Sequence, residues 1–252
     1  MSELFSIQLQ NRQQQGRDGV WLDLPTTTEQ VQAALRQIGI SSDNPQGLFI
    51  SGYFAEEEKR FAIPYNMVLA SNVDELNFLA SRLETLSTGE RAELNAALQA
   101  PQSELFSIGR ITDFPENVDY YVHLPDVHGP AQLGDYYLNR SGMVDMPEEW
   151  KGGIDTAQFG RYVAQQEQGV FTEYGYLVKS GDVWQKVHEG QPVPEEYRVL
   201  SFPVPEVMRD AANIPPPVQP ETELQKVIPI ILNGKDSAER MKEITDRLET
   251  GI

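Results

Sequence analysis

The chain has 252 residues, 40% of them hydrophobic, so it can bury the core of one large domain or of two to three small ones. Lys and Arg number 20 against 38 Asp and Glu, which gives a formal net charge of -18. This excess of carboxylates argues against direct binding to nucleic acid, because a DNA-binding protein needs cations to displace the counterions of the phosphates. It favours a basic partner, although many acidic proteins are simply well solvated.

Other classes of protein are excluded by features that the sequence lacks. There is no cysteine, which rules out disulfides and thiolate metal sites. The N-terminus has no basic region followed by an apolar stretch, and no apolar run approaches the roughly 18 residues of a membrane span. We therefore expect a cytoplasmic protein that contacts no membrane.

The first predicted subdomain covers residues 1–70 and has ββαβ order. Strands are expected over residues 4–9, 20–25 and 48–53. Between the second and third strands, Thr28 is expected to cap a helix that carries Val31 and Leu35 and ends at Gly39. This part of the chain therefore predicts a small α+β unit.

A helical subdomain is expected over residues 71–102. Asn72 or Ser71 is the predicted N-cap of its first helix, and Thr88 is the predicted N-cap of its second. Acidic residues in the first turn of each helix are favourable against the helix dipole. That effect explains their position without any functional role.

The third predicted subdomain, residues 103–182, is again α+β. Residues 103–108 (SELFSI) repeat residues 2–7 letter for letter, and residues 121–125 echo residues 21–25 at nearly the same offset. Two aligned echoes suggest a duplicated α+β unit. Helices are expected over residues 131–140 and 156–165, and a pair of strands over 169–178.

Beyond residue 182 the composition changes. Residues 183–235 are predicted to be an extension and Pro-rich linker, because consecutive prolines form polyproline II rather than a packed element. A helix is expected over residues 236–252, either as the start of a further domain or as a peptide that docks on the body. The predicted fold class is thus α+β: an elongated array of three small subdomains (α/β, helical, α/β), then a linker and a terminal helix.

Carboxylates are concentrated in residues 113–149, where eight Asp and Glu accompany a single cation, Arg140. A solvated surface usually mixes both signs, because like charges repel. Two readings remain open: a plain solvated surface, or a surface whose carboxylates replace DNA phosphates in a basic channel. Carboxylates held several ångströms apart on a rigid protein satisfy the same Lys and Arg side chains that a DNA channel presents.

Catalysis and metal binding have little support in the sequence. His123 and His128 are five residues apart around a proline, which is not the i, i+4 spacing of a helical metal pair. There is no Gly-rich phosphate loop and no Gly-x-Ser-x-Gly elbow. Adjacent pairs such as Glu148 and Glu149 are more typical of a solvated surface than of a catalytic pair. We therefore expect a protein that is not an enzyme and has no cofactor and no metal.

Three stretches of the chain resemble the ArdA antirestriction family. Residues 20–25, followed by a helix ending at Gly39, look like the family's opening unit, and residues 73–80 (VDELNFLA) look like its central helix. Most specific are residues 133–142 (LGDYYLNRSG), followed by Pro147 and residues 154–161, which resemble the stretch that contains the family's antirestriction motif. The likeness runs in order over roughly residues 1–180.

The resemblance implies a dimeric protein of a mobile element or phage that blocks type I restriction-modification enzymes by imitating bent B-form DNA. The predicted phosphate mimics are Asp74, Glu75, Glu84, Asp113, Glu116, Asp119, Asp126, Asp135, Asp145, Glu148, Glu149 and Asp155. Two adjacent tyrosines cannot both face inward on one helix, and aromatic residues are enriched at interfaces. A homodimer interface is therefore expected at Tyr136, Tyr137, Met143 and Val144.

The chain also departs from the family. Its charge density is lower than that of strongly acidic members, and the family core ends near Leu177. Residues 239–252 resemble the lead-in to a second antirestriction-type domain of large mobile-element proteins, which would make the chain a fragment of one. The alternative function is a protein-binding adaptor that acts on another target such as a CRISPR effector, and a hydrolase with a carboxylate pair is the third.

Overall fold

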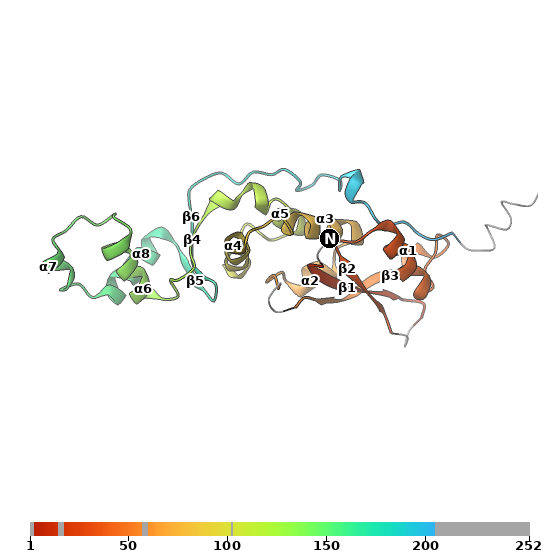
Figure 1. The fold of residues 1–252 in the computed structure, drawn as a ribbon, viewed down its shortest axis with the longest axis horizontal. Coiled ribbons are helices and arrows are strands. Elements are labelled where there is room, and N and C mark those ends of the chain that lie inside the picture. The colour runs from red at the N-terminus through yellow and green to blue at the C-terminus, as the bar shows by residue number, and fades with distance from the viewer. Residues whose placement is uncertain (1–2, 15–17, 57–59, 102, 205–252) are drawn as a thin grey trace, which may run out of the picture. The chain divides into compact units, whose positions relative to one another are not determined.

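A computed structural model of the chain describes residues 3–14, 18–56, 60–101 and 103–204, which belong to one compact unit, Met1–Pro205 (Figure 1). The helix predicted over residues 236–252 lies outside the described residues. The fold class is α+β, as predicted, while the division into three subdomains remains a prediction. The helices and strands are β1 (Phe5–Asn11), β2 (Val20–Leu24), α1 (Thr28–Gln37), β3 (Leu48–Phe54), α2 (Tyr65–Leu69), α3 (Val73–Leu83), α4 (Thr88–Gln99), α5 (Ile108–Thr112), β4 (Tyr121–Leu124), α6 (Pro130–Asp135), α7 (Glu148–Lys151), α8 (Thr156–Glu167), β5 (Val170–Thr172) and β6 (Gly175–Lys179).

The first sheet is antiparallel, with strand order β2-β1-β3. Alternation along β1 buries Phe5, Ile7 and Leu9 in the core, to which α1 adds its own apolar face. The predicted ββαβ order is confirmed, with a one-residue shift at the helix start. Thr27 rather than Thr28 is the N-cap, because its side chain accepts from the backbone N–H of Gln30 in a capping box.

Three helices follow: α2 is short, and α3 and α4 are longer. Asn72 caps α3 as predicted, and Ser87, one residue before the predicted Thr88, caps α4. In both helices a glutamate in the first turn completes a capping box by accepting from the N-cap backbone N–H. These polar ends leave the apolar faces of α3 and α4 to join the same core as the first sheet.

The second sheet is also antiparallel, with strand order β4-β6-β5. The hairpin predicted over residues 169–178 is confirmed as β5 and β6. The prediction of a duplicated α+β unit is wrong. The second SELFSI copy forms no strand, because Ser107 becomes the N-cap of α5. Strand β4 therefore pairs with β6 instead of with the repeated hexapeptide.

Helices α6 and α8 cross so closely that only glycine fits between them. A Cβ built on Gly134 would lie 1.9 Å from the Thr156 carbonyl oxygen, and one on Gly160 would lie 1.8 Å from that of Pro130. The helix predicted over residues 131–140 is α6 continued by one π-helical turn, Tyr136–Arg140. A π-helical turn often marks a functional site. This region has a small core of its own, built on Val127, Leu133 and Tyr176.

Residues 180–204, which we call the strap, pass along α5, α3 and α1 (Figure 1). The extension predicted from residue 183 is packed over its described part, residues 183–204. Trp184 and Val199 are 9% and 6% exposed and belong to the main core. Proline-rich composition did not reveal this packing, because buried side chains and backbone hydrogen bonds to the body, rather than a repeating ladder, hold the strap.

Candidate functional site

Part of the predicted set of phosphate mimics is exposed to solvent: Asp119, Asp126, Asp145, Glu148, Glu149 and Asp155. They lie on a short 3-10 turn before β4, in the loops after β4 and before α7, in α7 and at the start of α8. Glu148 pairs with Lys151 at 2.6 Å, and Asp155 caps α8 by accepting from the Gln158 N–H. The others form no ion pair or hydrogen bond with any described residue, so their full charge is open to a basic partner.

Two half-buried carboxylates of the predicted set, Asp135 and Glu116, are paired with nearby cations. Asp135 accepts from Asn139 and Arg140, both at 2.8 Å, and these hydrogen bonds hold the pKa of its carboxyl below the usual value. Glu116 forms an ion pair with Arg82 of α3. Because each of these charges is already partly compensated, it contributes less to a long-range negative field.

Two of the predicted phosphate mimics, Asp74 and Glu75 of α3, form hydrogen bonds that stabilise the fold. Asp74 accepts from two successive backbone N–H groups of the strap, those of Val199 and Leu200, both at 2.7 Å. Glu75 completes the α3 capping box. Glu84 follows the helix and is half-buried. These three side chains are therefore less exposed than those around α7.

Asp113 does not belong to the acidic surface, and its prediction as a phosphate mimic is wrong. The residue is 0% exposed. Its two carboxylate oxygens accept from the backbone N–H groups of His188 at 2.6 Å and Glu189 at 3.2 Å. A buried carboxylate is tolerated only when such charge-assisted hydrogen bonds satisfy it. Asp113 thus anchors the strap to the end of α5.

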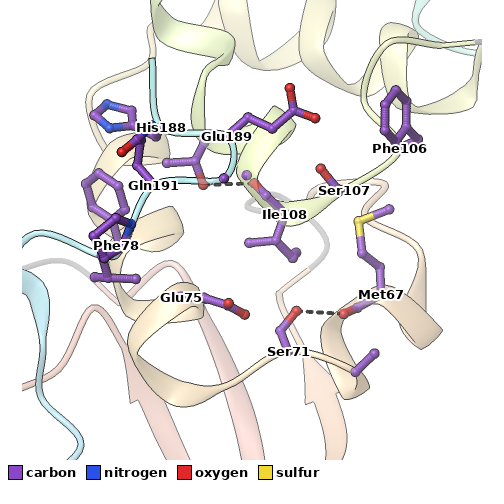
Figure 2. A pocket seen from close by; sticks show the side chains of 16 residues that line it. Met67, Ser71, Glu75, Phe78, Phe106, Ser107, Ile108, His188, Glu189 and Gln191 are labelled. Atoms are coloured by element: carbon purple, nitrogen blue, oxygen red, sulfur yellow. Dashed lines mark hydrogen bonds between the residues drawn. The ribbon is translucent and has the colours of Figure 1, made fainter. Parts of the chain in front are cut away.

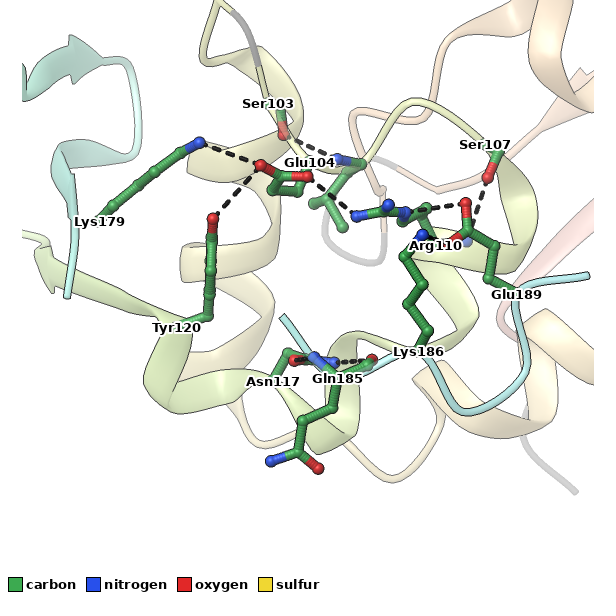
Figure 3. A network of polar contacts seen from close by, with 11 residues as sticks. Ser103, Glu104, Ser107, Arg110, Asn117, Tyr120, Lys179, Gln185, Lys186 and Glu189 are labelled. Carbon is green, nitrogen blue, oxygen red and sulfur yellow. Dashed lines mark hydrogen bonds and ion pairs between the residues drawn. The ribbon is translucent and has the colours of Figure 1, made fainter. Parts of the chain in front are cut away.

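A polar network around Arg110 was not predicted (Figure 3). Nη1 of Arg110 donates to Glu104 at 2.9 Å, and its Nε lies 2.9 Å from Glu189 of the strap. Lys179 adds a second cation 3.2 Å from Glu104. The hydrogen bond from Arg110 is the main cause that lowers the pKa of the Glu189 carboxyl. The network neutralises two acids and ties the strap to the loop before α5.

The unusual environment of Glu93 in α4 was also not predicted from the sequence. One of its oxygens is buried without a hydrogen-bond partner among the described residues. Burial, followed by repulsion from Glu90 and Asp119, raises the pKa of the Glu93 carboxyl to about 8. The side chain is therefore mostly protonated at neutral pH, and it adds little to the negative surface.

The predicted dimer residues differ in exposure. Tyr136 and Tyr137 are both half-buried, and their rings meet edge to face with centroids 5.5 Å apart. Tyr137 donates to one oxygen of Glu167, and Tyr176 donates to the other at 3.0 Å. Burial and the shared carboxylate raise the pKa of both phenols. The hydroxyl group of Tyr137 is thus already bonded to Glu167 within the protein.

The apolar side chains nearby are more open. Met143 is 74% exposed, and Val144 is half-buried. Trp150 of α7 and Tyr162 of α8, which were not predicted, are 69% and 60% exposed. Large apolar side chains at such exposure are typical of contact surfaces when they gather in one region. The four-residue helix α7 is too short to give Trp150 a periodic signal in the sequence, and the predicted helix over residues 156–165 did not show which of its aromatic side chains face solvent.

Within the described ranges of the chain, no three His, Cys, Asp or Glu side chains gather closely enough to hold a metal ion. None of the helices in those ranges is long and apolar enough to cross a membrane. The Nε2 atom of His123 is 2.7 Å from the carbonyl oxygen of Tyr174, which gives this imidazole a structural partner between β4 and the β5–β6 turn.

Comparison with known proteins gives one family. The family model described as antirestriction protein (ArdA) matches residues 15–178, which is more than half of the chain. No curated protein matches the sequence. The matched range contains all the exposed carboxylates named above and ends before the strap begins.

Proposed function

The chain belongs to the ArdA antirestriction protein family, and from this premise we propose that it blocks type I restriction-modification enzymes by occupying their DNA-binding channel as a mimic of B-form DNA. The protein acts as an inhibitor, and its carboxylates take the place of phosphates. No step of this action needs catalysis, a cofactor or a metal. The protein binds the enzyme rather than the nucleic acid.

The observation that carries the proposal is the set of exposed, uncompensated carboxylates in the matched range. Asp119, Asp126, Asp145 and Glu149 have no cation beside them within the described residues. A channel lined with Lys and Arg attracts such a surface at long range, as it attracts the regularly spaced charges of duplex DNA. Because a fold holds these side chains in place, binding costs less ordering entropy than the binding of a disordered acidic tail.

We further propose that the protein acts as a homodimer through the region of the π-helical turn. Tyr136, Tyr137, Met143 and Val144 are the predicted interface. The exposure of Trp150 and Tyr162 on the neighbouring helices supports an interface there, because aromatic side chains are enriched at the centres of interfaces. Sedimentation equilibrium of the full chain and of Trp150→Ser tests this part of the proposal.

The test of mimicry is competition between the protein and labelled duplex DNA for a purified type I restriction-modification complex over a series of salt concentrations. We expect displacement of DNA at low salt that weakens steeply as salt rises. A triple variant with Asp126→Asn, Asp145→Asn and Glu149→Gln should compete about tenfold less well, since each exposed ion pair is worth about 0.2–1 kcal/mol.

A matched control removes three charges from outside the matched range. Asp182→Asn, Glu195→Gln and Glu196→Gln change exposed carboxylates of the strap, and this variant should compete nearly as well as the original protein. Equal losses in the two triple variants would mean that only net charge matters. Absence of displacement at every salt concentration would remove the type I enzyme as the target.

The alternative, an adaptor that binds a different defence protein such as a CRISPR effector, predicts a different pattern. An adaptor concentrates its binding energy in a few apolar or aromatic side chains, of which Trp150 is the most exposed aromatic one. A large loss on Trp150→Ser, with no loss in the carboxylate variant and with an unchanged oligomeric state, would favour the adaptor.

A further inference from the structure

A cavity of about 660 Å³ lies where the end of α2, the start of α3, the start of α5 and the strap meet (Figure 2). Its volume is in the range of pockets that bind small ligands or inserted side chains, about 300–1,000 Å³. One wall is formed by strap residues 188–193, which follow the range matched by the family. The cavity is therefore a feature that the family match alone does not account for.

The walls of the cavity are held by hydrogen bonds and ring contacts. Asp113 fixes the backbone of His188 and Glu189 from behind. The His188 ring packs edge to face on Phe78 of α3, with centroids 4.9 Å apart. On the opposite side, Ser71 donates to the carbonyl oxygen of Met67 at 2.8 Å and closes the corner between α2 and α3 (Figure 2). A cavity with fixed walls costs little to organise when a ligand enters.

The inner part of the lining is mostly apolar, with aromatic rings at two sides. Met67, Phe78 and Ile108 form the inner surface, and Phe106 lies at the rim, 62% exposed. Phe106 already has a guanidinium group near its ring, because the Cζ atom of Arg110 lies 4.8 Å from the ring centroid. The Phe106 ring therefore already has a cation as a neighbour and contributes apolar surface to the rim of the cavity.

The only charged side chains that line the cavity are acidic. Glu189 is engaged by Arg110 and Lys186, whereas Glu75 points into the cavity (Figure 2). One oxygen of Glu75 accepts from the Asn72 N–H at 3.3 Å. The other has no partner within the described part of the chain, so it is available to a cation. No Lys or Arg lines the cavity to compensate it.

We propose that this cavity binds an arginine side chain presented by a partner protein. The aliphatic stem would lie against Met67 and Ile108, while the guanidinium would pair with Glu75 (Figure 2). Arginine fits better than lysine, because its planar group presents several N–H donors to a carboxylate in a fixed geometry. The inference rests on the proposed function, since a DNA channel is rich in arginine, and it names a specific contact within an otherwise diffuse charged interface.

The probe is the peptide acetyl-Leu-Arg-Leu-amide, titrated into the full chain labelled with ¹³C at its methionine methyl groups. The Met67 signal, assigned from Met67→Leu, should shift in a saturable way. The matched peptide with citrulline in place of arginine has the same shape without the charge, and it should bind about tenfold more weakly, as expected when a charged hydrogen bond is lost. Equal shifts with both peptides, or no shift with either, would overturn the proposal.

Two variants test the location. Glu75→Gln keeps the capping box, because glutamine also serves at that position, and it should remove the preference for arginine over citrulline. Ala70→Trp places a large side chain at the exposed rim and should abolish the Met67 shift, while Ala33→Trp, at an exposed site on α1, should not. Retained arginine binding in Ala70→Trp would also overturn the proposal.

The peptide experiment is independent of any restriction enzyme. If arginine binds but the protein does not displace DNA from the type I complex, the cavity stands and the proposed target fails. If the protein displaces DNA but the peptide does not bind, mimicry stands and the arginine pocket fails. When both succeed, Ala70→Trp should weaken the competition with DNA, and Ala33→Trp should leave it unchanged.

Discussion

The hexapeptide Ser-Glu-Leu-Phe-Ser-Ile occurs at residues 2–7 and again at residues 103–108. In the first copy Phe5, Ser6 and Ile7 begin the strand β1, whereas the second copy runs through a loop into the helix α5. In the first copy Phe5 is 3% exposed and packs on Tyr53. In the second copy its counterpart Phe106 is 62% exposed, and it lies at the rim of a cavity. Identical local sequence thus leads to a core residue in one region and a surface residue in the other.

The residues that follow each copy decide the outcome. After Ile7 the alternation continues through Leu9 to Asn11, and β1 becomes the central strand between β2 and β3. After Ile108 the next buried apolar residue is Ile111, at the i, i+3 spacing of a helix. Strand pairing and helix capping, rather than the propensity of six residues, therefore select the conformation.

Removing the phenylalanine from each copy gives the largest expected contrast. Phe5→Ala should lower the free energy of unfolding by about 3–5 kcal/mol, since it empties a buried site beside Tyr53. Phe106→Ala should cost less than about 1 kcal/mol, because exposed side chains contribute little to the core. Urea unfolding followed by circular dichroism measures both. Similar losses in the two variants would mean that the second copy is buried in solution.

Replacing Gly160 of α8 and Gly52 of β3 by alanine compares how tightly the protein packs around these two residues. Gly160→Ala should destabilise the protein by about 3 kcal/mol or more, because the new methyl group meets the backbone carbonyl of Pro130 at 1.8 Å. Gly52→Ala in β3 meets mainly the side chains of Gln8 and Trp21, at 3.0 Å.

The Trp21 ring can turn, and the Cβ atom of Gln8, which is fixed to β1, has to shift by only a few tenths of an ångström, so Gly52→Ala should cost about 1 kcal/mol. Thermal unfolding of the two variants tests the contrast. A mild effect of Gly160→Ala would show that α6 and α8 can separate without loss of stability. In that case the small core around Leu133 and Tyr176 would depend less on the glycine contact than the structure indicates.

Much of the secondary structure was predictable, because its signals are local. The ββαβ order, the Asn72 cap and the β5–β6 hairpin all follow from apolar spacing and capping residues within short windows. Errors of one residue at Thr27 and Ser87 arise where two neighbouring residues can both act as a cap. The repeated hexapeptide misled the prediction because its structure depends on which strands pair with it.

The candidate site was less predictable, because burial of its carboxylates depends on distant segments. Asp74 contacts Leu200, 126 positions away, and Asp113 contacts Glu189, 76 positions away. No local pattern distinguishes Asp113, which is buried, from Asp119, which is exposed. Charge counting therefore found the acidic region, but it could not tell which carboxylates face solvent and which hold the strap.

Glu93 of α4 makes the free energy of unfolding sensitive to pH. Its pKa is raised to about 8 in the folded protein from an ordinary value of 4.5, so folding favours the protonated form. Its contribution to stability is full below about pH 4.5 and is lost as the pH rises through about 8. Allowing for solvent screening, the loss should be about 1–3 kcal/mol.

Urea unfolding at pH 6 and pH 9 measures this loss. Glu93→Gln should reduce the difference between the two values, since glutamine cannot ionise. Glu196→Gln, at an exposed position on the strap, should leave the difference unchanged. An unaltered pH dependence in Glu93→Gln would assign the effect to other groups.

The serines that follow the two phenylalanines give the smallest and sharpest contrast. Ser107→Ala removes the N-cap of α5, whose Oγ accepts from the Arg110 N–H at 3.3 Å, and it should cost about 1 kcal/mol. Ser6→Ala removes only an exposed hydrogen bond to Asp23, and it should cost a few tenths of a kcal/mol. Ser107→Asp should retain the cap and so restore stability, whereas Ser6→Asp should destabilise β1 by repulsion from the facing Asp23. Opposite responses to one substitution would show that the two copies differ in conformation in solution, independently of how deeply each is buried.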